Sequence, residues 1–322
     1  MGAGNPQTGR KKEIMKKTST KKFDIYEEVT KRITEELEKG VIPWQKPWKT
    51  KATGEMFPCF SYSTGKRYDF INIMLLGGEP GEFATFNQIT KEGGKVKKGA
   101  KSRFIVGWVV TDHQRKDADG KPLVDEDGKP ETYKTFGLRY YSVFNILTDV
   151  EGLQPKKNWT EDEGEENAVD PVESAEKILH GYIDRPDAPK FEEKASNKAY
   201  YQPGLDLVVV PDKRQYEYIE EYYSTAFHEL THSTMKASRC NREEDRKGKK
   251  CAFGSEVYSK EELVAEIGAA SLVMIAGIET EHSFRNSAAY IQSWLKALKD
   301  DVTMLVYASS QAQKAVEYIL GE

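Results

Sequence analysis

The motif HELTH at residues 228–232 constrains this chain more than any other feature of its sequence. It lies in the stretch 213–236, whose pattern of apolar residues predicts a helix. Side chains four residues apart on a helix face the same side, so His228 and His232 can share one cation. Glu229 lies beside them, and we expect it to act as general base on a water molecule activated by that cation.

A catalytic zinc site needs a third protein ligand and one open position. A second helix is predicted from residue 259, and Glu262 and Glu266 share one of its faces. One of them can bind the metal while the other holds a histidine N–H from behind. The arrangement resembles the glutamate-ligand zincins, which implies Glu262 as the ligand and Glu266 behind it, with Glu266 and Glu261 as alternative ligands. We expect Zn²⁺, with Mn²⁺ as an alternative.

The charge distribution divides the chain into two unlike halves. Residues 1–150 hold 27 lysines and arginines against 20 acidic residues, and residues 151–322 hold 21 against 32, so a net charge of −4 separates into +7 and −11. A length of 322 residues suggests two domains, and 154–170 is an acidic stretch typical of a linker. No apolar run is long enough to span a membrane, and no secretory signal is recognisable, so we expect a cytoplasmic protein.

The basic half predicts a small α+β domain that binds nucleic acid. It contains a helix at 23–39, a loop at 41–48, a helix at 69–76, strands near 103–111 and 138–146, and a long hairpin or insertion at 112–134. The loop carries two tryptophans on a proline-stiffened backbone, which could stack on bases or, alternatively, cover the sheet. A lysine-rich glycine turn at 91–103 is suited to phosphate.

These features define the candidate DNA contacts. The proposed set comprises Trp44, Lys46, Trp48, Arg67, Asn72, Lys95, Lys97, Lys98, Lys101 and Arg103. Because no base-reading helix is recognisable, we expect contacts to backbone and unstacked bases rather than to a specific sequence. In the other half, the strand at 206–211 is the candidate edge strand that lines the cleft of a peptidase.

Taken together, the motifs resemble the ArdC-type antirestriction proteins of plasmids, phages and other mobile elements. The resemblance covers roughly residues 20–280 and rests on the segments 42–48, 68–76, 84–88, 93–99, 144–153, 206–211, 227–232 and 261–266. It departs from the family at Asp69 and Phe70, beside Asn72, at Cys240, and in the charged insertion at 112–130.

The resemblance implies an α+β protein of two domains. The expected limits are a disordered tail at 1–20, a single-stranded-DNA-binding domain at 21–153, the linker at 154–170, and a mainly helical, zincin-like metallopeptidase domain with a small sheet at 171–322. It implies a protein that shields incoming DNA from restriction and carries a zinc peptidase site. The alternatives are a non-enzymatic DNA protector with a structural metal and a DNA-tethered protease that acts on DNA-bound host proteins.

Overall fold

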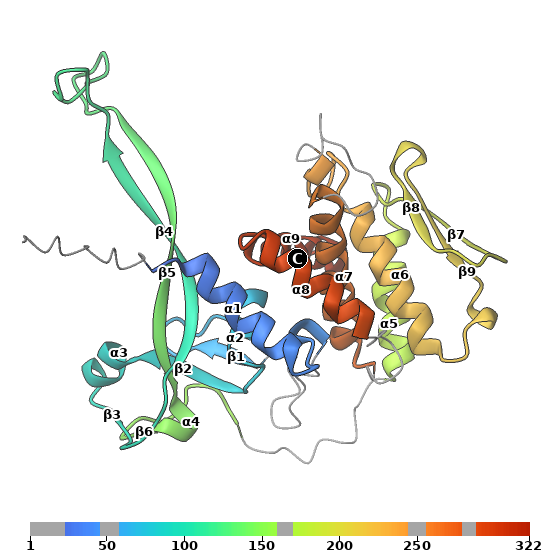
Figure 1. Ribbon diagram of the computed structural model, residues 1–322, viewed down its shortest axis with the longest axis horizontal. Coiled ribbons are helices and arrows are strands. Elements are labelled where there is room, and N and C mark those ends of the chain that lie inside the picture. Colours follow the sequence, from blue (N-terminus) through green and yellow to red (C-terminus); the bar gives the residue numbers. More distant parts are fainter. Residues whose placement is uncertain (1–22, 46–57, 160–169, 244–255, 279–287) are drawn as a thin grey trace, which may run out of the picture.

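The computed structural model describes residues 23–45, 58–159, 170–243, 256–278 and 288–322. Figure 1 shows two domains of mixed helices and strands, the first carrying a long β-ribbon that projects from it. The predicted tail at 1–20 and the middle of the predicted linker lie outside the described residues. No described helix is long and apolar enough to cross a membrane.

The first domain combines short helices with a four-stranded sheet and a two-stranded one. Its elements are α1 (Ile25–Glu38), η1 (Pro43–Gln45), β1 (Cys59–Ser61), α2 (Phe70–Leu75), β2 (Gly81–Thr85), α3 (Phe86–Lys91), β3 (Lys95–Val96), β4 (Arg103–Gln114), β5 (Thr132–Asn145), α4 (Ile146–Asp149) and β6 (Val150–Glu151). The larger sheet has the strand order β1-β2-β5-β4, and β3 pairs with β6. Asp24 begins α1 by accepting hydrogen bonds from the amides of Tyr26 and Glu27.

The two longest strands, β4 and β5, form the ribbon. Their antiparallel pairing runs without interruption from Arg103 opposite Val143 to Gln114 opposite Thr132. At the tip, Asp117 and Asp125 each accept hydrogen bonds from two following amides, and each is followed by a glycine with positive φ. The segment predicted as a hairpin or insertion is therefore the outer end of a β-ribbon.

In the described part of the second domain, five helices pack beside a three-stranded sheet. Its elements are α5 (Pro171–Ile183), β7 (Lys190–Lys194), β8 (Tyr200–Gln202), η3 (Pro203–Leu205), β9 (Leu207–Pro211), η4 (Lys213–Gln215), α6 (Ile219–Ser233), α7 (Glu256–Ala276), α8 (Ala288–Asp300) and α9 (Met304–Leu320). The helix predicted from 213 begins only at Ile219, because a separate 3₁₀ turn occupies 213–215. The sheet order is β7-β9-β8, so β9 is the central strand and β8 is an edge. The expectation of an edge strand at 206–211 is wrong.

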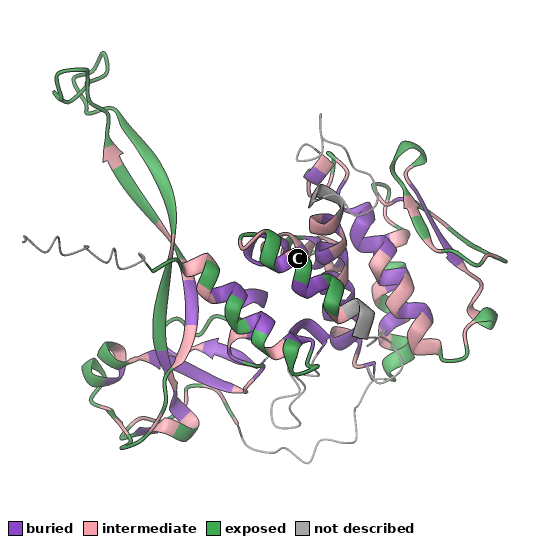
Figure 2. Ribbon diagram, viewed as in Figure 1, coloured by how far each residue is buried: buried purple, intermediate pink, exposed green. Residues whose placement is uncertain are grey.

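The two domains share one apolar core. Helix α1 packs on α8, α2 on α9, and η1 on α7, and the buried side chains of both domains form a continuous cluster. Figure 2 shows that both domains contain buried residues. Thr30 Oγ1 donates to the carbonyl of Val302 at 2.8 Å, and the Phe70 amide donates to Gln313 Oε1 at 3.2 Å. Because apolar surface of each domain is buried against the other, the halves are not independent units joined only by a linker.

The start of the predicted linker is part of the first domain. The Lys157 amide and the Trp159 indole N–H both donate to Glu82 Oε1, at 2.8 and 3.0 Å. Glu82 is buried, so these two donors supply hydrogen bonds that its carboxylate would otherwise obtain from water. Residues up to 159 therefore extend the first domain beyond the predicted limit at 153.

Candidate metal centre and nucleic-acid surface

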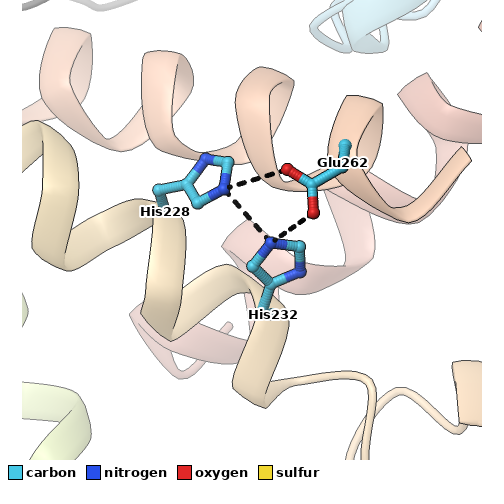
Figure 3. A group of neighbouring side chains, drawn as sticks. All are labelled: His228, His232 and Glu262. Carbon is cyan, nitrogen blue, oxygen red and sulfur yellow. Dashed lines mark hydrogen bonds and ion pairs between the residues drawn. The ribbon is translucent and has the colours of Figure 1, made fainter. Parts of the chain in front are cut away.

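The two histidines of the HELTH motif converge as their helical spacing predicts. His228 and His232 lie one turn apart on α6, with their Nε2 atoms 3.1 Å apart (Figure 3). The neighbouring helix α7 brings the carboxylate of Glu262 to the same point, with oxygens 3.6 Å from His228 Nε2 and 3.5 Å from His232 Nε2. One ligand atom from each of the three lies within 4.8 Å of the others. Two imidazoles and a carboxylate fit a divalent transition metal.

Close packing of α6 and α7 makes this convergence possible. A Cβ on Gly268 would lie 2.6 Å from Thr231 Cγ2, a distance at which the two helices would have to separate. Thr231 is fully buried, and its hydroxyl donates to the carbonyl of Phe227 at 2.7 Å. A glycine at 268 therefore lets the glutamate-bearing helix approach the histidine-bearing helix.

The carboxylate that contacts the Nδ1 atom of His232 belongs to Glu261. The expectation that Glu266 supports a histidine of the cluster is therefore wrong. Glu261 Oε1 lies 3.2 Å from His232 Nδ1. Arg242, which is 2% exposed, binds the two Glu261 oxygens at 2.8 and 3.0 Å and so prevents that carboxylate from turning. With its proton on Nδ1, His232 presents the lone pair of Nε2 towards His228 and Glu262. Glu266 instead lines a cavity that His228 and Glu229 also line.

The electrostatics of the cluster favour protonated histidines. Burial would lower the pKa of His232, but hydrogen bonds to Glu261 and Glu262 overcome this effect and raise it to about 10. Burial would raise the pKa of the Glu262 carboxyl, but His228 and His232 lower it well below its usual range. A metal that takes these ligands must displace protons from the imidazoles, so its binding releases protons.

The cluster opens to two cavities that meet at the same residues. The larger, about 720 Å³, is lined by Glu266, Tyr216 and Asn197, and the smaller, about 310 Å³, is lined by β8 and Met235. His228 and Glu229 line both. An extended substrate could therefore occupy both cavities and place the bond that reacts beside Glu229 and the cluster.

The structure also corrects part of the predicted DNA-contact set. Trp44 is 1% exposed and packs edge-on against Trp294 at 6.2 Å, so it cannot stack on a base. Asn72 is buried, and its amide bonds both the N–H and the carbonyl of Val106, at 2.8 and 2.7 Å. Arg103 is held by the carboxylates of Glu79 and Asp149. These three side chains hold the fold together and are not free for phosphate or bases.

The remaining predicted contacts have different outcomes. Lys46 and Trp48 lie outside the described residues. The exposed members of the set are Arg67, Lys95, Lys97, Lys98 and Lys101. Lys97 also donates to the carbonyl of Thr148 at 2.9 Å, which orders part of the lysine-rich turn. Among the described residues, Arg67 and the lysines of the turn are therefore exposed cationic side chains, as the sequence predicts.

An exposed aromatic face on the ribbon was not predicted. Trp108 is 53% exposed, Phe136 68% and Tyr140 50%. Trp108 lies opposite Leu138, and Val110 opposite Phe136, so these side chains share one face of the two strands. The alternation of apolar residues indicated the strands, but only the structure shows how this face is placed. Trp108 and Leu138 border a cavity shared with α9, whereas the outer part of the ribbon is exposed (Figure 2).

Comparisons with known proteins agree with this organisation. Residues 23–144 match the family model of the N-terminal domain of anti-restriction factor ArdC, and residues 186–311 match that of a zincin-like metallopeptidase. Two proteins named DNA primase TraC from Escherichia coli are 34% and 33% identical over 93% of this chain. The chain spans only 20% and 27% of their lengths.

Two further relatives match over nearly their whole length. An uncharacterised protein of Sinorhizobium fredii, y4eC, is 28% identical over 92% of this chain and 91% of its own. The metal-free crystal structure of the antirestriction protein ArdC from plasmid R388 is 31% identical, with a TM-score of 0.63, and covers 92% of this chain and 97% of its own. A Mn(II)-bound structure of the same protein gives a TM-score of 0.63 at 29% identity, covering 93% of this chain and 98% of its own. The chain therefore belongs to the ArdC family of antirestriction proteins.

Proposed function

We propose that this protein binds single-stranded DNA through its first domain and hydrolyses peptide bonds at a zinc ion held by His228, His232 and Glu262 in its second. The observation that carries the hydrolytic part is the convergence of these three side chains beside Glu229, at the junction of two cavities. A metal bound there would supply a Lewis acid that activates water and polarises a carbonyl group. Mn²⁺, which the R388 protein holds in one structure, is the alternative metal.

The chain's own residues have separate tasks in this reaction. Glu229 accepts a proton from the attacking water and delivers it to the amine that leaves. Arg242 and Glu261 hold His232 in one orientation. The edge strand β8 borders the smaller cavity, and its outer side is suited to an extended peptide because β9 occupies only its inner side.

Replacing Glu229 with Gln tests the hydrolytic role. The shape of the side chain is kept, so we expect metal content and thermal stability to stay unchanged while peptide cleavage falls by about 10²–10⁴-fold. Glu217→Gln, at an exposed position just before α6, is the matched control. If DNA protection by Glu229→Gln in cells remains complete, hydrolysis does not deliver antirestriction, and the non-enzymatic DNA protector becomes the better description.

The DNA-binding part rests on two exposed features of the first domain, the lysine-rich turn and the aromatic face of the ribbon. Lysines release condensed counterions from phosphates, and aromatic rings stack on unpaired bases. We expect the full chain to prefer single-stranded over double-stranded oligonucleotides in fluorescence anisotropy, with affinity that falls steeply as salt rises.

Alanine at Lys95, Lys98 and Lys101 tests the turn directly. Each lysine that contacts phosphate contributes about 0.7 to the slope of log affinity against log salt, so the triple variant should lose a slope of about 2. The control replaces three exposed lysines of the second domain, Lys177, Lys190 and Lys198. Equal slopes in the two triple variants would place the phosphate contacts elsewhere.

A further inference from the structure

The larger cavity beside the metal cluster is acidic. Glu229 and Glu266 both line it, together with His228 and neutral polar residues such as Ser196 and Asn197. No lysine or arginine is among the described residues that line this cavity. Its volume of about 720 Å³ lies in the usual range for ligand-binding cavities, so part of a peptide can enter it.

The charges around the cluster are balanced except at Glu266. Arg242 pairs with Glu261 at 2.8 Å. A divalent metal held by the histidines would offset the negative charges of Glu262 and Glu229. Within the described ranges of the chain, Glu266 forms no hydrogen bond or ion pair. Its carboxylate is therefore left without a cationic partner even when the metal site is filled.

The carboxylate of Glu266 is accessible from the cavity. In the described part of the chain, the side-chain oxygens that are buried without a partner belong to Gln45 and Asp301, so the unpaired oxygens of the partly exposed Glu266 are open to solvent. Its neighbours on α7, Ala265 and Ile267, are buried. Because the helix is covered on both sides of Glu266, a ligand reaches this carboxylate through the cavity that it lines.

A second metal ion does not account for Glu266. Among the described residues, His228, His232 and Glu262 are the only group whose ligand atoms lie close enough together to hold an ion. A single carboxylate with free oxygens is instead suited to an organic cation, which it binds by a charge-assisted hydrogen bond.

We propose that Glu266 is a specificity-determining residue whose carboxylate binds the ammonium or guanidinium group of a lysine or arginine side chain in the peptide substrate. Both side chains carry their charge at the end of a long stem, so the charge can enter the cavity while the peptide backbone stays beside the cluster. This inference rests on the proposed peptidase function, and it names basic polypeptide segments as the substrate class.

The test measures binding of peptide hydroxamates to the zinc-loaded full chain by calorimetry. Each probe has the same metal-binding group and an arm that carries either lysine or norleucine, which has a similar stem without the ammonium group. Arms extend from the metal-binding group in either direction, and acetohydroxamate is the probe without an arm. In the unaltered chain, one lysine arm should bind about tenfold more tightly than its norleucine counterpart, which is about 1.4 kcal/mol.

Two substitutions at Glu266 and one control separate a local contact from a general effect of charge. Glu266→Gln should abolish the preference for lysine and leave the affinities for zinc, acetohydroxamate and the norleucine arm unchanged. Glu266→Lys should reverse the preference, so that an arm carrying glutamate binds more tightly than the lysine arm. Glu217→Gln changes the net charge by as much as Glu266→Gln does, at an exposed position, and should keep the preference for lysine.

Four outcomes would overturn the proposal. If the preference for lysine survives Glu266→Gln, another group binds the cation. If Glu266→Gln weakens the binding of zinc and acetohydroxamate, Glu266 supports the metal instead. If norleucine arms add affinity in the unaltered chain but lysine adds nothing more, the peptide cleft stands and the inference fails. If no arm adds affinity over acetohydroxamate, the proposed peptide cleft fails, and the inference fails with it.

Discussion

The α6–α7 helix pair and the β4–β5 ribbon present functional side chains in opposite ways. In the helix pair, His232 is held by Glu261, which Arg242 holds in turn, and both of these side chains are almost fully buried. On the ribbon, Trp108 and Phe136 are more than half exposed. Fixed geometry suits a reaction that aligns a cation, a water molecule and a peptide bond, whereas exposed rings suit bases whose positions vary. Substitutions in the helix pair should therefore change stability and metal binding, whereas substitutions on the ribbon should change DNA affinity and leave stability almost unchanged.

The largest effect is expected at Glu261. Glu261→Gln leaves the guanidinium of Arg242 buried without its carboxylate, which should lower the free energy of unfolding by about 3–5 kcal/mol. Loss of the partner of His232 Nδ1 should also weaken zinc binding by about 10–100-fold. Denaturant titration and competition with a zinc chelator measure the two effects. Glu266→Gln is the control, and equal losses in both variants would return the supporting role to Glu266.

Next in size is the contrast between two tryptophans. Trp44→Ala removes a buried ring from the contact between the domains and should lower the free energy of unfolding by about 3–5 kcal/mol. Trp108→Ala removes an exposed ring and should change it by no more than about 0.5 kcal/mol. Chemical denaturation of both variants gives the comparison. A destabilised Trp108 variant would show that the ribbon face is covered in solution.

Asp206 is a partly buried carboxylate that accepts hydrogen bonds from Lys236, Arg239 and Tyr201. Burial would raise its pKa, but these hydrogen bonds lower the pKa below its usual range. A depressed folded-state pKa stabilises the fold above the unfolded value, and this contribution disappears as pH falls through the folded value.

Asp206→Asn should therefore destabilise the chain by about 1–2 kcal/mol at pH 7. The effect is smaller than for a fully buried ion pair, because water screens the partly exposed carboxylate. The difference in free energy of unfolding between the variant and the unaltered chain should shrink below about pH 4. Asparagine also tolerates the left-handed backbone at this position, where φ is 49°. Urea titrations at pH 7 and pH 3.5 test the sign, and a difference that grows on acidification would contradict it.

The smallest expected effect concerns DNA. Trp108→Ala should lower the affinity for single-stranded oligonucleotides by about 1 kcal/mol or more, because one base loses its stacking partner. Leu123→Ala, at another exposed apolar position on the ribbon, is the matched control and should leave affinity unchanged. Anisotropy titration at one salt concentration suffices, and equal affinities in the two variants would exclude the ribbon face as a stacking surface.

Glu261, Glu262 and Glu266 show how far the sequence could predict the candidate site. The stretch around them predicted a helix, and the resemblance to glutamate-ligand zincins implied Glu262, which lies with the two histidines. The residue behind His232 could not be chosen in the same way, because it depends on how α7 is rotated against α6. That rotation follows from the close approach of Gly268 to Thr231 and from Arg242, which reaches Glu261 from a segment outside both helices.

The loop around Trp44 and Gln45 shows why the predicted set of DNA contacts included side chains that are buried. Proline, tryptophan and lysine in succession are equally compatible with an exposed binding loop and with a wedge between domains. The α8 tryptophan Trp294 that covers Trp44 lies 250 positions away in the chain. The lysine-rich turn was simpler to predict, because consecutive lysines and glycines have no buried alternative of low free energy.

By itself, the sequence determined the features that depend on near neighbours: the helical face shared by His228 and His232, the first helix of the chain, and the turns at the tip of the ribbon. Only the tertiary structure decided which glutamate supports His232, that Trp44 is buried, and that Gln45 borders the cleft of the other domain. The physical reason is that backbone geometry relates residues a few positions apart. Burial and hydrogen bonding between distant segments depend on how whole helices and sheets pack.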